Sequence, residues 1–183
     1  MSDIIVLFTS KYGSSKQCAE WLASELNADL FESSGPQAGN WDKYSTIVYC
    51  GGIYVGSVNG IKTLVKKHAA LQGKKIAVVA CGLSDPMDQE VFERVKSGLF
   101  RELPQGLHGN VKFFLLRGGI TYSNLKLTDK AMIKMLEKML RKKKPETLKD
   151  EERKMLEVLG KDTGFSLDRT LIQPIIEYCK GPK

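Results

Sequence analysis

A group of hydroxyl side chains surrounds a single glycine near the start of the chain. Residues 9–15 read Thr-Ser-Lys-Tyr-Gly-Ser-Ser and lie between the apolar run 4–8 and a pattern typical of an amphipathic helix. A loop between a buried strand and a helix directs backbone N–H groups and the helix N-terminus at one point, where an anion can bind. The hydroxyls suit a phosphate monoester. The alternative is an ordinary turn in which Ser or Thr caps the helix.

This loop does not have the composition of two common nucleotide-binding loops. A Walker loop needs two glycines and a Gly-Lys-Ser/Thr ending, and a Rossmann dinucleotide loop needs three glycines. Gly13 is the single glycine of residues 9–15. We therefore expect a terminal phosphate rather than a dinucleotide at this position.

Two further loops follow apolar runs that predict buried strands. The run 46–50 precedes a glycine-rich stretch over 51–60, and the run 75–80 precedes the loop 81–86. In an open parallel sheet, a ligand binds outside the carboxyl ends of the strands where the strand order reverses. We therefore expect a crevice between the loops 10–15 and 51–57. Turn chemistry without function is the alternative for the second and third loops.

The chain alternates strand and helix signals for most of its length. Apolar runs at 4–8, 28–31, 46–50, 75–80 and 112–116 predict an α/β fold with a doubly wound, five-stranded parallel sheet. Its 183 residues fit a single domain, 1–183. After Arg117 the alternation stops, and about 117–166 reads as a helical insertion with helices over 128–143 and 148–159. Thr147 to Asp150 predicts a capping box for the second of these helices.

Several of these segments resemble flavodoxins. Residues 10–15 match the flavodoxin phosphate loop Ser/Thr-x-Thr-Gly-x-Thr, except that Tyr12 stands at a threonine position. Residues 52–56 and 65–68, together with 117–122 running into 129–135, resemble the flavodoxin subgroup that contains the menaquinone-dependent protoporphyrinogen dehydrogenase of bacteria. That subgroup carries a helical insertion at the same place. The resemblance implies a flavodoxin-like sheet of order 2-1-3-4-5 and FMN as the cofactor.

The resemblance assigns three groups of residues to FMN. Tyr54 is expected to stack on the flavin ring with its hydroxyl in water. No side chain is expected to act as a catalytic residue, because the flavin carries the redox chemistry. The phosphate group is Ser10, Lys11, Tyr12, Gly13, Ser14 and Ser15, the ring group is Gly52, Ile53, Tyr54, Val55 and Gly56, and the pyrimidine group is Cys81, Gly82, Leu83 and Ser84.

Positive charge and methionine are concentrated in the expected insertion. The chain has a net charge of +7, and residues 126–144 hold eight Lys or Arg against two acidic residues. A stripe on the helix 128–143 consists of Met132, Met135, Leu136, Met139 and Leu140. Such a stripe packs on its own domain or docks on a protein partner or an anionic membrane, and both alternatives stay open. We expect a small-molecule redox substrate or a quinone as a partner, and no nucleic acid.

Other features narrow the class of protein. The four cysteines are widely spaced and form no Cys-x-x-Cys pair, which argues against zinc, iron–sulfur clusters and a disulfide framework. No apolar run reaches the roughly 18 residues of a membrane span, so we expect a cytoplasmic protein, with peripheral binding to the inner face of the membrane as an open alternative. Asp85 and Asp88 are expected to cap a helix, with proton transfer to a reduced flavin as the alternative. Trp41 and Tyr44 are expected to belong to the core or its rim.

The resemblance and the residues together predict an FMN-dependent oxidoreductase. It would pass electrons from a reduced organic substrate, with protoporphyrinogen as one candidate, to a quinone-like acceptor. One alternative is a flavodoxin-type electron carrier between protein partners. Another is a flavodoxin-like module that has lost its flavin, because Tyr12 departs from the motif.

Overall fold

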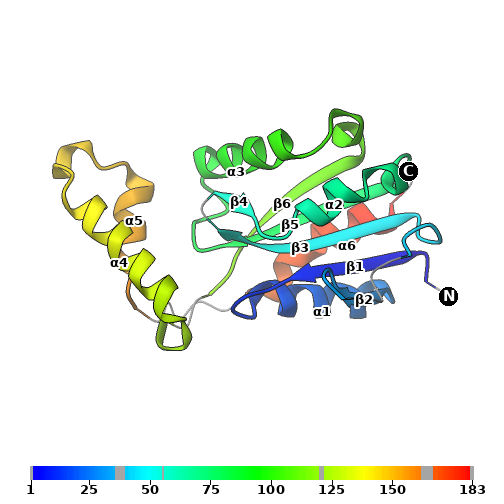
Figure 1. Ribbon diagram of the computed structural model, residues 1–183, viewed down its shortest axis with the longest axis horizontal. Helices are drawn as coiled ribbons and strands as arrows, with labels where there is room; N and C mark the ends of the chain where they lie inside the picture. The colour runs from blue at the N-terminus through cyan, green and yellow to red at the C-terminus, as the bar shows by residue number, and fades with distance from the viewer. Residues whose placement is uncertain (1, 36–39, 55, 120–121, 162–166, 182–183) are drawn as a thin grey trace.

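A parallel sheet forms the centre of the molecule (Figure 1). The computed structural model describes residues 2–35, 40–54, 56–119, 122–161 and 167–181. Five strands pair in parallel in the order β2-β1-β3-β5-β6, which confirms the predicted fold class and the order 2-1-3-4-5 of the five predicted strands. They are β1 (Ile4–Thr9), β2 (Asp29–Glu32), β3 (Thr46–Tyr54), β5 (Lys75–Gly82) and β6 (Val111–Arg117).

Helices cover both faces of this sheet, which is why its central strands are apolar on both sides. On one face, α1 (Ser14–Leu26) and α6 (Gln173–Lys180) pack against side chains such as Val6, Val48 and Val79. On the other, α2 (Lys62–Lys66) and α3 (Gln89–Glu102) pack against a second cluster that includes Ile47. Short 3-10 helices connect elements at His68–Leu71, Gln105–Asn110, Tyr122–Asn124, Pro145–Thr147 and Arg169–Ile172.

The glycine-rich stretch 51–60 is only partly a loop. β3 continues to Tyr54, and the chain returns as the antiparallel strand β4 (Ser57–Val58), which pairs with the end of β3. Gly51 belongs to β3, and a glycine is favoured there because the returning chain is close. A Cβ atom on Gly51 would lie 2.7 Å from the carbonyl oxygen of Asn59. The expectation of a loop over the whole stretch is therefore wrong, and a hairpin carries Tyr54 instead.

The irregular region after β6 forms two helices beyond the carboxyl edge of the sheet (Figure 1). We call residues 122–161 the α4–α5 segment, after α4 (Leu127–Arg141) and α5 (Asp150–Val158). The segment has a small apolar cluster of its own, which includes Leu125, Ile133, Leu140 and Leu159.

Local chemistry sets the ends of these and neighbouring helices. The predicted Thr147 capping box is wrong: the Thr147 hydroxyl donates to the Lys144 carbonyl at 2.8 Å, and Glu152 instead accepts from the Lys149 N–H at 3.1 Å. Asp88 accepts hydrogen bonds from the backbone of Glu90 and Val91, as predicted for a helix cap. The same prediction for Asp85 is wrong, because Asp85 accepts from the Met87 N–H in the turn before α3. Within the described part of the chain, no helix is both long and apolar enough to cross a bilayer.

Candidate functional site

A cavity of about 380 Å³ lies at the carboxyl ends of the strands, between the sheet and the α4–α5 segment. Gly13 does not line it, and Val55 lies outside the described residues. The predicted residues that do line it come from all three loops: Ser10, Lys11, Tyr12, Ser14, Ser15, Gly52, Ile53, Tyr54, Gly56, Cys81, Gly82, Leu83 and Ser84. The structure thus brings together in one cavity three loops that are distant in sequence.

The loop 10–15 keeps the start of α1 open toward this cavity. Gly13 is the N-cap residue, with φ 98°, and no side chain caps α1. The ordinary capped turn, which was the alternative for this loop, is therefore not what forms. The Ser10 hydroxyl accepts from the Gly13 N–H at 3.1 Å, which fixes the turn. The first N–H groups of a helix have no partner within the helix, so an anion can bind them here.

The hydroxyls of this region divide between the fold and the cavity. Thr9 lies within hydrogen-bond distance of Ser33, at 2.5 Å, and of Tyr49, at 2.8 Å, so it belongs to the sheet end. The Ser14 hydroxyl donates to the Gly119 carbonyl at 3.0 Å and ties the loop to the segment after β6. Ser10, Ser14 and Ser15 line the cavity and are the hydroxyls that could contact a phosphate.

Tyr12 is turned toward the α4–α5 segment. Its ring packs against the apolar cluster of that segment, together with Tyr122 and Leu136. Its hydroxyl oxygen is buried and has no hydrogen-bond partner among the described residues. The departure from the threonine of the motif thus has a structural consequence: an aromatic ring joins the phosphate loop to the segment.

Close contacts between glycines and neighbouring side chains shape the other two loops. A Cβ atom on Gly82 would lie 2.6 Å from the Ile53 Cδ1, and one on Gly118 would lie 3.0 Å from the Ser14 Cβ. The Gly118 N–H also donates to the Gly82 carbonyl at 2.7 Å. A side chain at 82 would displace the end of the Ile53 side chain, and one at 118 would require Ser14 to shift by a few tenths of an ångström, so both glycines permit this close packing.

A buried carboxylate on α4 connects the phosphate loop 10–15 with the end of β3. The Asp129 side chain, on α4, accepts from the Lys11 Nζ at 2.8 Å and from the Tyr54 hydroxyl through the same oxygen, Oδ1. Asp129 is 3% exposed, and Tyr54 is 36% exposed. The hydrogen bond to Asp129 raises the pKa of the Lys11 ammonium group above its ordinary value. The expectation that the Tyr54 hydroxyl is in water is wrong, because Asp129 binds it.

An apolar wall from the α4–α5 segment also lines the cavity, and α3 contributes Arg94 and Val95. Sequence analysis did not assign Asp129 or this wall to the site. The sequence signals for Asp129 are its place in the stretch 129–135, which resembles the flavodoxin subgroup, and its negative charge within a strongly basic helix, and the signal for the wall is helical periodicity. The wall consists of Leu125, Met132, Ile133, Leu136, Met155 and Leu159.

The predicted methionine stripe of α4 is divided between two environments. Met132 and Leu136 line the cavity, and Leu140 is buried in the cluster of the segment. Met135 and Met139 instead face outward, 71% and 54% exposed. The stripe thus packs on the domain at some positions and leaves an apolar surface at others.

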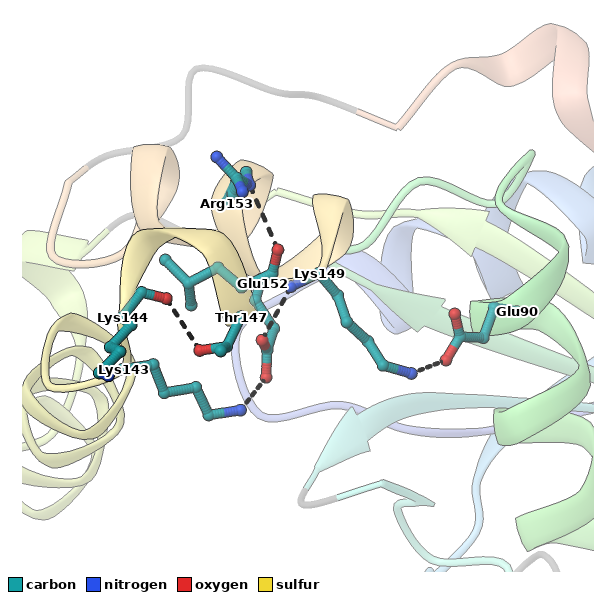
Figure 2. A network of polar contacts seen from close by, with 8 residues as sticks. Glu90, Lys143, Lys144, Thr147, Lys149, Glu152 and Arg153 are labelled. Carbon is teal, nitrogen blue, oxygen red and sulfur yellow. Dashed lines mark hydrogen bonds and ion pairs between the residues drawn. The ribbon is translucent and has the colours of Figure 1, made fainter.

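Ionic contacts attach α5 to the main body of the protein. Figure 2 shows the Lys149 ammonium group paired with Glu90 at the start of α3. Nearby, Lys143 pairs with Glu152 at 2.6 Å and links the end of α4 to α5. Both partners of the Lys149–Glu90 pair are mostly exposed, so this contact contributes little to stability.

Fold and cavity together define a doubly wound protein with a ligand crevice at the switch point of its sheet. Residues 5–147 match the flavodoxin domain family, and the chain belongs to that family. Membership implies a flavin cofactor. No curated protein matches the chain.

Solved structures that resemble this one include flavodoxins, at low sequence identity. A WrbA-like flavodoxin from Agrobacterium tumefaciens is 17% identical, with a TM-score of 0.46 over 62% of this chain and 82% of that one. The Trp repressor binding protein of Bacillus subtilis is 15% identical, with a TM-score of 0.41 over 63% of this chain and 82% of that one.

Proposed function

We propose that this protein is an FMN-dependent oxidoreductase that takes electrons from a reduced organic substrate and passes them to a quinone-like acceptor. The observation that carries the proposal is the composition of one cavity: an open helix start beside three serines, glycine-rich loops at two strand ends, and an apolar wall opposite them. The first two suit a phosphorylated flavin. The wall adds contact area for a second apolar molecule, which an electron carrier does not need.

The residues present fit FMN in charge and shape. Ser10, Ser14 and Ser15 would hold the phosphate with the N–H groups at the start of α1. Ile53 and Tyr54 would flank the ring, and the loop 82–84 would supply main-chain donors to its polar edge. Bound FMN supplies the transfer of electrons. The protein binds and orients both partners and excludes water from the space between them.

The resemblance to the subgroup with protoporphyrinogen dehydrogenase supports a substrate with a large, apolar ring system. Naphthoquinones and protoporphyrinogen are therefore the first compounds to test.

A titration of the purified protein with FMN, FAD and riboflavin tests the cofactor. We expect FMN to bind tightest, because the loop 10–15 ends at a helix start suited to a terminal phosphate. Anaerobic oxidation of the reduced, FMN-loaded protein by a naphthoquinone then tests the reaction. Oxidation at a rate that saturates with quinone concentration supports an enzyme, whereas fast reaction with one-electron protein acceptors alone supports the carrier. Failure to bind any flavin overturns the proposal.

The outward face of α4 supports a second part of the proposal, peripheral binding to an anionic membrane. Leu127, Met135 and Met139 are 84%, 71% and 54% exposed and lie on the same helix as Lys134 and Lys138. Apolar side chains among lysines suit an anionic bilayer surface. Co-sedimentation with vesicles of phosphatidylglycerol, but not of phosphatidylcholine, is expected and should weaken with salt. Equal or absent binding to both contradicts it.

A further inference from the structure

Two buried polar atoms of the cavity residues lack partners. Among the described residues, neither the Tyr12 hydroxyl nor the Asp129 Oδ2 makes a hydrogen bond. Both residues line the cavity, one from the phosphate loop and the other from α4, and each of the two atoms exposes less than 1 Å², so a ligand reaches them only when adjoining side chains shift. A buried polar group without a partner costs free energy, so such groups are rare and usually meet a ligand or water.

The cavity that these residues line has both apolar and polar side chains, and Arg94 of α3 is among the polar ones. Tyr12 packs within the cluster of the α4–α5 segment, and Met132, Ile133 and Leu136 continue the wall from α4. Asp129 Oδ1 already accepts from Lys11 and Tyr54, so the carboxylate is oriented and its second oxygen is left over. A carboxylate only accepts hydrogen bonds, whereas a tyrosine hydroxyl can donate or accept.

We infer that Tyr12 and Asp129 form the polar contact of a subsite for the reduced substrate, a flat aromatic compound that carries O–H or N–H donors. The inference rests on the proposed function and names the substrate class of the same cavity. Asp129 Oδ2 accepts from the donor of the reduced compound, and the apolar wall contacts its ring. An oxidised quinone presents carbonyl oxygens, which a carboxylate does not bind, so Asp129 favours the reduced form over the oxidised one.

A pair of redox-inert probes separates donor recognition from apolar contact. 2,3-Dihydroxynaphthalene carries two O–H donors, and 2,3-dimethoxynaphthalene has the same ring without them. Calorimetric titration of the FMN-loaded protein should show at least about tenfold tighter binding of the dihydroxy compound, since a site built around hydrogen bonds rejects an analogue that lacks them. FMN content, measured by absorbance in the same samples, reports on the proposed function separately.

Four variants assign the preference to these atoms. Asp129→Asn should reduce the preference to about threefold or less, because one acceptor oxygen becomes a donor group. Tyr12→Phe should weaken binding of the dihydroxy compound by about threefold or more. Asp150→Asn, on the exposed start of α5, and Tyr122→Phe, in the same apolar cluster but outside the cavity, are the matched controls and should change neither value.

Melting temperature provides a reading that does not depend on a ligand. Tyr12→Phe removes a hydroxyl without a partner, so the ligand-free variant should melt at the same temperature as the parent or higher. A fall of more than about 4 °C, roughly 1 kcal/mol for a domain of this size, would show that the hydroxyl is structural and overturn its assignment. Equal binding of the two naphthalenes by the parent protein, or an unchanged preference in Asp129→Asn, overturns the inference even where FMN is bound.

Discussion

The sheet with its flanking helices and the α4–α5 segment are held in place by different kinds of contact. The sheet packs between two clusters of almost fully buried apolar side chains, and four free cysteines lie within or beside them. The α4–α5 segment has a small cluster, which Tyr12 of the phosphate loop joins, and it faces a cavity. It also makes the part-buried ion pair Lys11–Asp129 and the exposed, weak pair Lys149–Glu90 with the rest of the protein. This difference indicates that the two regions have different roles. We propose that the sheet provides stability and the loops for the cofactor, whereas the α4–α5 segment recognises the substrate.

A matched pair of leucine substitutions should show the largest contrast. Leu99, on α3, is fully buried, and Leu99→Ala should lower the free energy of unfolding by about 2–5 kcal/mol. Leu136, on α4, is half-buried beside the cavity and already lacks neighbours on one side, so Leu136→Ala should cost about 1 kcal/mol or less. Urea unfolding measures both. Equal costs would mean that the segment is as tightly packed as the sheet.

A backbone substitution in the phosphate loop should affect FMN more than it affects stability. A Cβ on Gly13 would meet no neighbour within 4 Å, so Gly13→Val acts through its φ of +98° and not through a clash. This backbone strain should redirect the N–H groups at the start of α1. The dissociation constant of FMN should rise about 10- to 100-fold, a loss of about 1.4–2.8 kcal/mol of binding free energy.

Gly73 is the control for this prediction. Its φ is +69°, it also has open space at the Cβ position, and it does not line the cavity. Gly73→Val should lower the melting temperature as Gly13→Val does, but it should leave the FMN dissociation constant unchanged. Normal FMN affinity in Gly13→Val would remove the loop 10–15 from the cofactor site.

The buried thiols should make the sheet core sensitive to alkaline pH. Burial raises the pKa of Cys179 from the ordinary 9.0 to about 11. Between these values the unfolded chain loses a proton that the native protein keeps, so stability falls as pH rises. From pH 8 to pH 10.5 the loss from this one group should be about 1–2 kcal/mol. Urea unfolding of Cys179→Ala should show a correspondingly shallower decline, and an identical decline would refute the assignment.

The ion pair between α5 and α3 should give the smallest effect. Glu90 and Lys149 each keep 61% of their side-chain exposure, so Glu90→Gln should change the free energy of unfolding by at most about 0.5 kcal/mol. Glu93→Gln, at an exposed position of the same helix, is the control. A loss above 1 kcal/mol in Glu90→Gln alone would show that this pair holds the segment in place.

Local patterns predicted the sheet and the convergence of its loops because both follow from short-range properties. The apolar runs around Val48 and Val78 read as strands buried on two faces, and the order of the strands places their carboxyl ends on one edge. Asp88 and the buried Trp41 were predicted for the same reason, since a cap and an apolar ring depend mainly on neighbouring residues.

Contacts made across the cavity could not be predicted in this way. Tyr12 read as a defect in a phosphate motif, and its partner surface on α4 begins more than 100 residues later. Asp129 read as one acidic residue in a basic helix, and only the tertiary placement of α4 brings it to Lys11 and Tyr54. The shifted cap of α5 is a smaller case, because the Thr147 hydroxyl is used by the preceding 3-10 turn.

We propose that the sheet loops hold the flavin while the α4–α5 segment recognises the substrate. Deleting residues 124–160 and joining the ends with a short Gly-Ser linker tests it most directly, with FMN affinity and the rate of oxidation by a naphthoquinone measured on the same folded sample. We expect the FMN dissociation constant of the shortened protein to stay within about threefold of the parent value, because the segment adds no phosphate donors. We also expect the saturable reaction with the quinone to be lost, because the apolar wall is gone. Loss of FMN from the folded protein, or an unchanged quinone reaction, would contradict it.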